Sequence, residues 1–249
     1  MNHTIYMAYA GLRSRAQALE VMTNNIANIH TSGFKGQKPY FKVRENTEGG
    51  YSQLAEAISA PVVDVFSGTD FSAGQLKETG NPLDLALTGE GFFVVETPMG
   101  LRYTRNGSFR LNKARELVTN EGFKVIAEGK QNQKPKAIKL PEGNVDVGQN
   151  GQIAVDGVMS AKLKLVTFEN LTQLKRVGGS LFEASAQAVE VPPARSQVAA
   201  GFLEQSNISA VKNITEVVSL MRSFEMLTRA IRSLTNNVDQ KVINEVGKV

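Results

Sequence analysis

Residues 217–238 read VVSLMRSFEMLTRAIRSLTNNV, a stretch in which large apolar residues recur at alternating spacings of three and four. The members of this stripe are Val217, Leu220, Phe224, Leu227, Ile231, Leu234 and Val238. Such a heptad stripe is typical of a helix that packs against another helix along a narrow seam. We therefore expect a helix over about residues 209–244, with Ser209 as its N-cap.

The N-terminal end of the chain carries a matching pattern. Two sets of residues recur every seven positions, Ile5, Leu12, Leu19 and Ile26 in the first and Ala8, Arg15, Met22 and Ile29 in the second. This pattern predicts a helix over about residues 4–30, followed by a stop at Gly33. We expect the two terminal helices to pair as a coiled coil. Both also carry apolar residues off the seam, among them Ala18, Val21, Ile214, Val218 and Met221, so each has more apolar surface than one partner helix would cover.

The region between the helices has the spacing of short strands. Leu83, Leu85 and Leu87 alternate with smaller or polar residues, and residues 92–95 form a short apolar run. Asn106-Gly107 lies between two further strand patterns and predicts a type I′ hairpin over residues 101–111. The fold class expected is therefore α+β, with long terminal helices and a β-rich centre. The expected divisions are residues 1–35 (N-terminal helix), 36–75 (extended linker), 76–200 (β domain) and 201–249 (C-terminal helix).

Composition excludes several classes of protein. The 249 residues include no cysteine, so the chain has no disulfide framework, cysteine-ligated metal or thiol nucleophile. The formal net charge of +4 comes from scattered basic residues rather than from a basic module, so we expect no nucleic-acid partner. No apolar run is long enough to cross a bilayer, and we expect no membrane insertion. The N-terminus lacks the features of a cleaved secretory signal peptide.

The sequence also lacks the motifs of an enzyme. Its two histidines, His3 and His30, have no ligand-like partners at metal spacing. Gly89-x-Gly91 lacks the third glycine of a dinucleotide-binding fingerprint, and no phosphate-binding loop or nucleophile elbow is present. We therefore expect no catalytic residues, no cofactor and no metal.

Several motifs together resemble the flagellar rod and hook proteins. Near the N-terminus these are Asn24-Asn25-Ile26-Ala27-Asn28 and Thr31-x-Gly33-Phe34-Lys35. The centre contributes Thr69-Asp70-Phe71-Ser72-x-Gly74-x-Leu76, Thr79-Gly80-Asn81-Pro82-Leu83-Asp84 and Tyr103-Thr104-Arg105-Asn106-Gly107-Ser108-Phe109. The C-terminal motifs are Gly201-x-Leu203-Glu204-x-Ser206-Asn207 and Arg222-Ser223-Phe224-Glu225. The resemblance covers nearly the whole chain and is strongest to proximal-rod members, with distal-rod members second.

The resemblance implies a structural subunit of the bacterial flagellar basal body. Such a subunit would leave the cell by the flagellar type III export route, without a cleaved signal peptide, and polymerise in the periplasm into the drive shaft between motor and hook. Its partners would be other rod subunits in a helical assembly, and the surrounding ring proteins are a further partner that it suggests. The subunit-interface residues expected are Ile5, Leu12, Leu19, Met22, Asn25, Ile26, Asn28 and Ile29 in the N-terminal part and the seven-residue stripe over 217–238.

Two other interpretations of the same residues stay open at this point. The terminal helices could form a self-contained hairpin on a β domain, with no polymer. Alternatively, the chain could be a β-rich binding module whose termini act as a dimerising clasp. The extra apolar stripes and the resemblance favour assembly into a helical filament, in which a head-to-tail contact does not close.

Overall fold

The computed structural model describes residues 2–44, 62–129 and 136–246, and it gives side chains for residues 9–42, 66–129 and 136–233. The chain divides into two compact units. The terminal unit consists of Met1–Ala27, Gln37–Gly68 and Ser209–Val249, and the β unit consists of Asn28–Gly36 and Thr69–Ile208. Both units are therefore built from segments that are far apart in the sequence.

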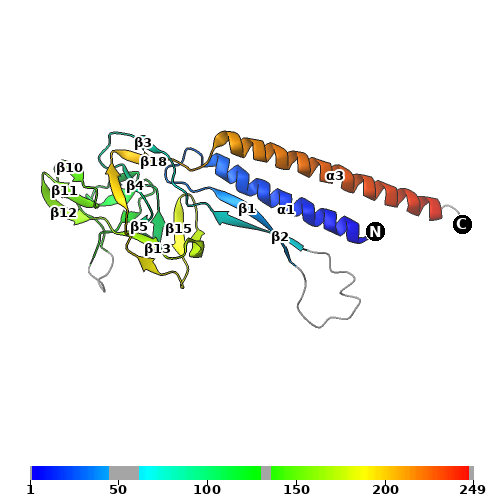
Figure 1. The fold of residues 1–249 in the computed structure, drawn as a ribbon, viewed down its shortest axis with the longest axis horizontal. Coiled ribbons are helices and arrows are strands. Elements are labelled where there is room, and N and C mark those ends of the chain that lie inside the picture. The colour runs from blue at the N-terminus through cyan, green and yellow to red at the C-terminus, as the bar shows by residue number, and fades with distance from the viewer. Residues whose placement is uncertain (1, 45–61, 130–135, 247–249) are drawn as a thin grey trace. The chain divides into compact units, whose positions relative to one another are not determined.

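The terminal unit holds both long helices and a two-stranded hairpin. Helix α1 (Asn2–Ala27) and helix α3 (Ala210–Val246) lie side by side and antiparallel (Figure 1). Strands β1 (Gln37–Arg44) and β2 (Val62–Thr69) pair with each other, and α1 packs against both α3 and β1. The α+β fold class and the pairing of the two helices agree with the expectation. The supercoil of a true coiled coil stays a prediction.

The helices end close to the expected positions, with one difference at α1. Ser209 precedes α3, and its Oγ accepts a long hydrogen bond of 3.5 Å from the Lys212 amide, as expected for an N-cap. Helix α1 ends at Ala27, so Asn28 and Ile29 follow the helix rather than continue its seam. The reason is local. The amide of Thr31 donates to the Asn28 carbonyl in a turn, and Gly33 takes a left-handed φ of 66°.

Residues 37–44 are a strand that the sequence did not predict. Residues 34 to about 60 read as polar and mixed, yet β1 lies within them. Residues 61–66 read as a candidate strand, and β2 covers residues 62–66 of that candidate and continues to Thr69. Residues 45–61 lie outside the described residues. The side chain of Tyr40 covers Gly68 on the paired strand, where an added Cβ would meet the Tyr40 ring at 2.7 Å.

The β unit is an array of short antiparallel strands. Its largest sheet has nine strands, with the path β14-β15-β6-β5-β9-β8-β7, and β13 pairs with β5 and β16. Smaller sheets have the orders β10-β11-β12, β17-β4 and β18-β3. The strand bounds are β3 Leu76–Glu78, β4 Leu85–Thr88, β5 Phe92–Thr97, β6 Gly100–Thr104, β7 Phe109–Leu111, β8 Leu117–Thr119, β9 Lys124–Val125, β10 Val145–Val147, β11 Gln152–Val155, β12 Val158–Lys162, β13 Leu165–Phe168, β14 Leu174–Arg176, β15 Leu181–Ala184, β16 Glu190–Val191, β17 Gln197–Ala200 and β18 Phe202–Glu204; a short 3-10 helix, η1, spans Leu171–Gln173.

The hairpin expected over residues 101–111 is wrong. Strand β6 pairs with β5 and β15, whereas β7 pairs with β8, so the two halves of the expected hairpin do not pair with each other. Neither Asn106 nor Gly107 has a positive φ, although a type I′ turn requires both. Gly107 instead lies against the backbone of Leu85, and the Leu85 amide donates to the Gly107 carbonyl. Close approach to another strand, rather than turn geometry, accounts for this glycine.

The core of the β unit consists of two clusters on the faces of the large sheet. The larger cluster includes Phe93, Phe109, Leu117, Ile138 and Ile153, and the smaller is built on aromatic residues. In the smaller cluster, the rings of Phe92 and Phe182 lie 5.8 Å apart, and Tyr103 and Phe168 lie 4.8 Å apart in an edge arrangement. Aromatic edge contacts of this kind add to the free energy gained by burial.

An ion-pair network at the margin of this core makes the stability of the β unit depend on pH. The Tyr103 hydroxyl donates to the Glu190 carboxylate, and Lys164 Nζ lies 3.0 Å from Glu190 Oε2. Burial raises the pKa of Glu190, but the hydrogen bonds from Tyr103 and Lys164 outweigh burial and hold that pKa below its usual 4.5. Because the folded-state pKa is the lower one, this group stabilises the fold above pH 4.5, and the contribution is lost as pH falls through the folded-state pKa.

We therefore expect Glu190→Gln to lower the free energy of unfolding at pH 7. Below the usual glutamate pKa, the free energy of unfolding of the variant should fall less steeply with decreasing pH than that of the wild type. The measurement is urea unfolding of wild type and variant across the acid range. Glu121→Gln, at an exposed position, is the control and should change neither. If the free energy of unfolding falls equally steeply with decreasing pH in wild type and in Glu190→Gln, the network does not have this role.

Candidate assembly surface and junction

The expected interface residues fall into three groups. On α3, Val217, Leu220, Phe224, Leu227 and Ile231 are half-buried, and on α1 Leu12, Leu19 and Ile26 are half-buried while Met22 and Asn25 are buried. Asn28 and Ile29 are half-buried in the turn after α1. The side chains of Ile5, Leu234 and Val238 lie outside the described residues. A role of these residues between subunits stays a prediction.

The most buried line on α1 includes two small residues, Ser14 and Ala18. Ser14, Ala18, Met22 and Asn25 are buried, at spacings of three and four. One turn before Ser14, a Cβ added at Gly11 would lie 3.8 Å from Cδ1 of Leu227, so α3 passes close to the backbone of α1. Small residues on one helix opposite large residues on the other permit this approach. The heptad pattern, which follows the large residues, did not indicate that the small ones would be buried more deeply.

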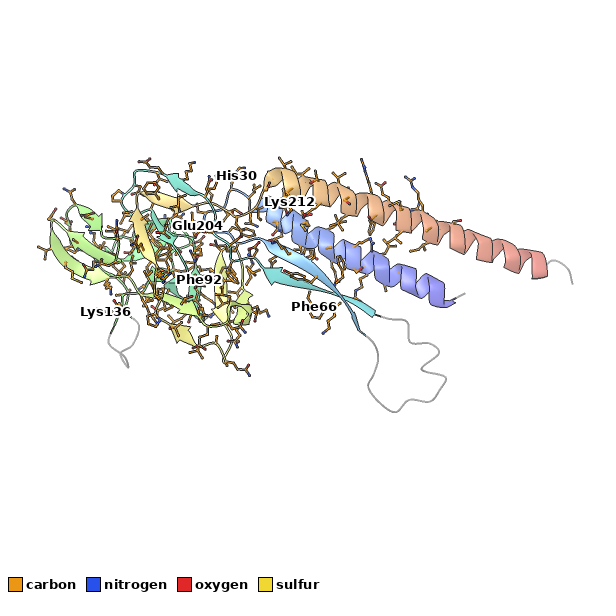
Figure 2. All side chains as sticks on the ribbon, viewed as in Figure 1. His30, Phe66, Phe92, Lys136, Glu204 and Lys212 are labelled. Carbon is orange, nitrogen blue, oxygen red and sulfur yellow. The ribbon has the colours of Figure 1, made fainter. Side chains whose placement is uncertain are left out.

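A second apolar stripe on α3 is exposed. Val211, Ile214, Val218 and Met221 follow spacings of three and four, and their exposed fractions are 75%, 51%, 42% and 50%. The hairpin of the same unit exposes Tyr40, Phe41 and Phe66, the last of which is labelled in Figure 2. Contiguous exposed apolar side chains are typical of interaction surfaces. We refer to the four α3 residues as the outer stripe.

Asn25 joins α1 to β1 through both ends of its amide group. Its Nδ2 donates to the Gln37 carbonyl at 2.7 Å, and its Oδ1 accepts from the Gln37 amide at 2.9 Å. The side chain thus satisfies the backbone of the first residue of β1 in the way a neighbouring strand would. An apolar residue at this position would leave the Gln37 amide and carbonyl without this partner. The structure therefore requires a side-chain amide here.

We expect Asn25→Ala to destabilise the terminal unit by about 1–3 kcal/mol, because it removes the partner of a backbone amide and a carbonyl. The protection of α1 and β1 against amide hydrogen exchange would report this loss. The control is Gln17→Ala on the exposed face of the same helix, which we expect to change stability by less than about 0.5 kcal/mol. A similar loss of protection in both variants would show that the Asn25 amide contributes nothing specific.

In the β unit, a buried carboxylate joins segments from both ends of the chain. Glu204 Oε1 lies 2.6 Å from Lys35 Nζ and accepts from the Gly74 amide at 2.9 Å, and its Oε2 lies 3.5 Å from Arg105 Nη1. The backbone carbonyl of Glu204 accepts from the Gly33 amide at 2.7 Å. We refer to Lys35, Arg105 and Glu204 as the Glu204 cluster; Glu204 is labelled in Figure 2.

The cluster is fully enclosed and carries two cations for one anion. The side chains of Lys35 and Glu204 are 0% and 1% exposed. Burial lowers the pKa of Lys35 and of Arg105, while the charge of Glu204 opposes that shift in both. Arg105 Nη2 also donates to the Gly89 carbonyl, and Lys35 Nζ to the Ser72 carbonyl. The Glu204 carboxylate therefore offsets part of the free-energy cost of burying the two cations.

Arg176 holds the same N-terminal segment from another side. Its guanidinium lies 4.2 Å from the centre of the Phe34 ring, and its Nη2 donates to the Lys35 carbonyl. Burial lowers the pKa of Arg176 to about 10. A stacked guanidinium that also donates to backbone fixes both the ring and the chain next to it.

Two glycines of the quoted motifs permit close contact of backbones at this junction. A Cβ at Gly33 would lie 2.2 Å from the Asn106 amide nitrogen, and one at Gly74 would lie 1.9 Å from the Gln205 carbonyl oxygen. Gly33 also has a positive φ, which favours glycine. The motifs at residues 31–35, 69–76, 103–109 and 201–207 thus meet at one place in the β unit.

The sequence did not predict this cluster. Lys35, Arg105 and Glu204 lie within the quoted motifs, but no motif indicated that the three form a site. A signal was present, because each is a charged residue within a short motif of glycine, asparagine and apolar residues. Their partnership could not be read from spacing, since 99 positions separate Arg105 from Glu204 and 169 separate Lys35 from Glu204.

Among the described residues, no group of three or more histidine, cysteine or acidic side chains could hold a metal ion. No described helix has the length and hydropathy needed to cross a bilayer.

Comparison with known families gives three matches along the chain. Residues 5–35 match the model described as flagella basal body rod protein, and residues 199–244 match the flagellar basal body rod FlgEFG protein C-terminal model. Residues 86–155 match the flagellar hook protein FlgE/F/G D1 domain. The two terminal matches contain most of α1, most of α3 and two members of the Glu204 cluster, and the third contains Arg105.

Individual relatives match over nearly their whole length. The flagellar basal-body rod protein FlgF of Caulobacter vibrioides is 28% identical over the full length of both chains. FlgF of Rhizobium meliloti is 30% identical over 99% of each chain, and FlgG of Agrobacterium fabrum is 32% identical over 90% of this chain and 92% of its own. This chain therefore belongs to the flagellar basal-body rod protein family and is a structural subunit of the rod, not an enzyme.

Proposed function

We propose that this chain is a proximal-rod subunit that polymerises through its terminal helices and so carries torque between motor and hook. The outer stripe of α3 is the observation that supports polymerisation most directly. Four apolar residues on one helix face stay exposed although α1, on a different face, already partners α3. Burial of such a stripe against a neighbouring subunit releases about 25 cal/mol per Å² of apolar surface, repeated at each subunit along the assembly.

The geometry favours an open assembly over a closed dimer. The seam that faces α1 and the outer stripe lie on different faces of α3, so one subunit can pair internally and bind a neighbour at the same time. A contact between unlike surfaces that does not close by rotation builds a helical filament. We further propose that the two helices supercoil around each other, and that residues 1–35 and 201–249 act as the axial parts of the subunit.

The proximal position is supported by the Arg222-Ser223-Phe224-Glu225-Met226 stretch and by full-length similarity to FlgF of Caulobacter vibrioides. The alternative is a distal-rod subunit, which the identity of 32% to FlgG of Agrobacterium fabrum favours. In either position we propose that the chain leaves the cell by the flagellar export route and assembles in the periplasm, where ring proteins surround it.

The test is an in-frame deletion in the source organism, with swimming and purified basal bodies examined. We expect loss of the rod, restored by the full chain but not by a chain that lacks residues 209–249. A proximal subunit must be added before a distal one, so the deletion should also remove the distal-rod protein from basal bodies. A rod stub that ends where the distal part should begin would support the distal alternative, and normal basal bodies would exclude both.

A further inference from the structure

Two non-glycine residues have a positive φ among those that the structure describes, Arg115 at 60° and Asp156 at 50°. This left-handed region is unfavourable for a residue that carries a Cβ, and glycine adopts it readily. A residue that keeps such a backbone is held there by its surroundings, and strain of this kind points to a role for the residue. Both lie in tight turns of the β unit, Arg115 between β7 and β8 and Asp156 between β11 and β12.

The side chain of Arg115 reaches a short exposed segment that leads into β10. Residues 141–144 join the buried Leu140 to β10, and all four are exposed; we refer to them as the link. Arg115 Nε donates to the Leu140 carbonyl at 3.3 Å, and its Nη2 donates to the Pro141 carbonyl. The Leu140 amide donates in turn to the Arg115 carbonyl at 2.9 Å. Arg115 therefore fixes the place where the link begins.

Asp156 holds the other end of the same link. Its Oδ1 accepts from the Asn144 amide at 2.9 Å, and its own amide donates to the Asn144 carbonyl at 3.0 Å. A Cβ at Gly143 would lie 2.1 Å from Asp156 Oδ2, so the glycine leaves the room that this carboxylate needs. Both residues with a strained backbone thus use a side chain to hold residues 140–144.

The segments on either side of the link are held by burial, whereas the link is not. Before it, Ile138 and Leu140 are buried, and the Ile138 amide donates to the Val125 carbonyl of β9 at 3.0 Å. After it, Val147 of β10 is buried in the same apolar cluster as Ile138. The link therefore spans from the large sheet to the sheet β10-β11-β12, which is labelled in Figure 1, and hydrogen bonds rather than burial hold it.

We propose that Arg115 and Asp156 are positioning residues that clamp the link at both ends and so fix the sheet β10-β11-β12 to the large sheet. Their side-chain hydrogen bonds offset the cost of the left-handed backbone in each turn. The competing explanation is that the shared core alone places the small sheet. The two explanations predict opposite effects of glycine at either position, because glycine relieves the backbone strain but removes the side chain.

The experiment is amide hydrogen exchange on the purified full chain that carries Arg115→Gly. We expect exchange at least about fivefold faster in residues 140–147, although the turn itself is relieved, while β5 and β6 keep their protection. Arg110→Ala is the matched control, since it removes an exposed guanidinium that donates to the Asn120 carbonyl at 3.0 Å in the same sheet. It should leave exchange in residues 140–147 unchanged.

Variants of Asp156 test the other end of the link. If the clamp acts as one unit, Asp156→Gly should speed exchange at Leu140 as well as at Asn144. Asp156→Asn keeps an oxygen that can accept from the Asn144 amide and a side chain that tolerates a left-handed φ, so it should preserve protection. Unchanged or slower exchange in both glycine variants, or faster exchange only at the end next to each substitution, would overturn the proposal.

The importance of a fixed small sheet for a shaft that carries torque rests on the proposed function. The exchange result does not, because it concerns the β unit of the isolated chain. A deletion strain with normal basal bodies would therefore exclude the rod function and leave the clamp standing, whereas unchanged exchange in the glycine variants would remove the clamp and leave the rod function standing.

Discussion

Leu227→Asp is expected to abolish swimming and rod assembly while the β unit remains folded. Leu227 is half-buried on the seam, with its Cδ1 3.8 Å from the position of a Cβ at Gly11. The change removes an apolar side chain and places a carboxylate where α3 passes closest to α1. Truncation of a fully buried leucine costs about 2–5 kcal/mol, so the loss of this half-buried side chain costs less, and a partly desolvated charge adds to that cost. Such a loss is large compared with the free energy gained when two helices pair.

The measurements are swimming, the recovery of rods in basal bodies, and circular dichroism of the purified chain. Leu227→Met keeps the volume and apolar character of the side chain and should preserve all three. Ala230→Asp introduces the same charge at an exposed position of the same helix and should leave the isolated chain unchanged. If the Leu227→Asp strain swims normally, the seam between α1 and α3 is not needed for assembly.

Gly107→Ala is expected to be the most destabilising small substitution in the β unit. A Cβ at this position would lie 1.6 Å from the Leu85 carbonyl oxygen and 3.2 Å from Cε2 of Phe93. Because the nearest atom belongs to backbone, no side-chain rotation can relieve the overlap, and β4 must move away from the loop. The shift would also strain the hydrogen bond of 2.9 Å from the Leu85 amide to the Gly107 carbonyl.

We expect a loss of about 3–4 kcal/mol in the free energy of unfolding of the β unit, from overpacking and the weakened hydrogen bond. This corresponds to a fall of roughly 10 °C in the melting temperature, measurable by calorimetry. Gly129→Ala is the control, since an added Cβ there meets nothing within 4 Å and its φ is not positive. If the two variants have equal melting temperatures, the Leu85 backbone moves away from the added Cβ without a loss of stability.

The sequence identified the terminal helices because their signal is local and periodic. Large apolar residues at spacings of three and four identify a helix wherever it packs, and the exposed outer stripe was visible as the residues Ile214, Val218 and Met221. The alternation of Leu83, Leu85 and Leu87 and the apolar run over residues 92–95 likewise located β4 and β5. The family resemblance was recognisable because its motifs recur in fixed order along the chain.

Tertiary structure alone decided which of these elements meet. Asn106-Gly107 is the strongest local hairpin signal in the chain, yet contact with the Leu85 backbone overrides it, and β6 pairs with β5 and β15. The Glu204 cluster is equally invisible to periodicity, because a buried ion pair depends on distance in space, and its members come from residues 35, 105 and 204. Local patterns fix elements through short-range sterics and burial, whereas a junction between distant segments exists only once the chain has folded.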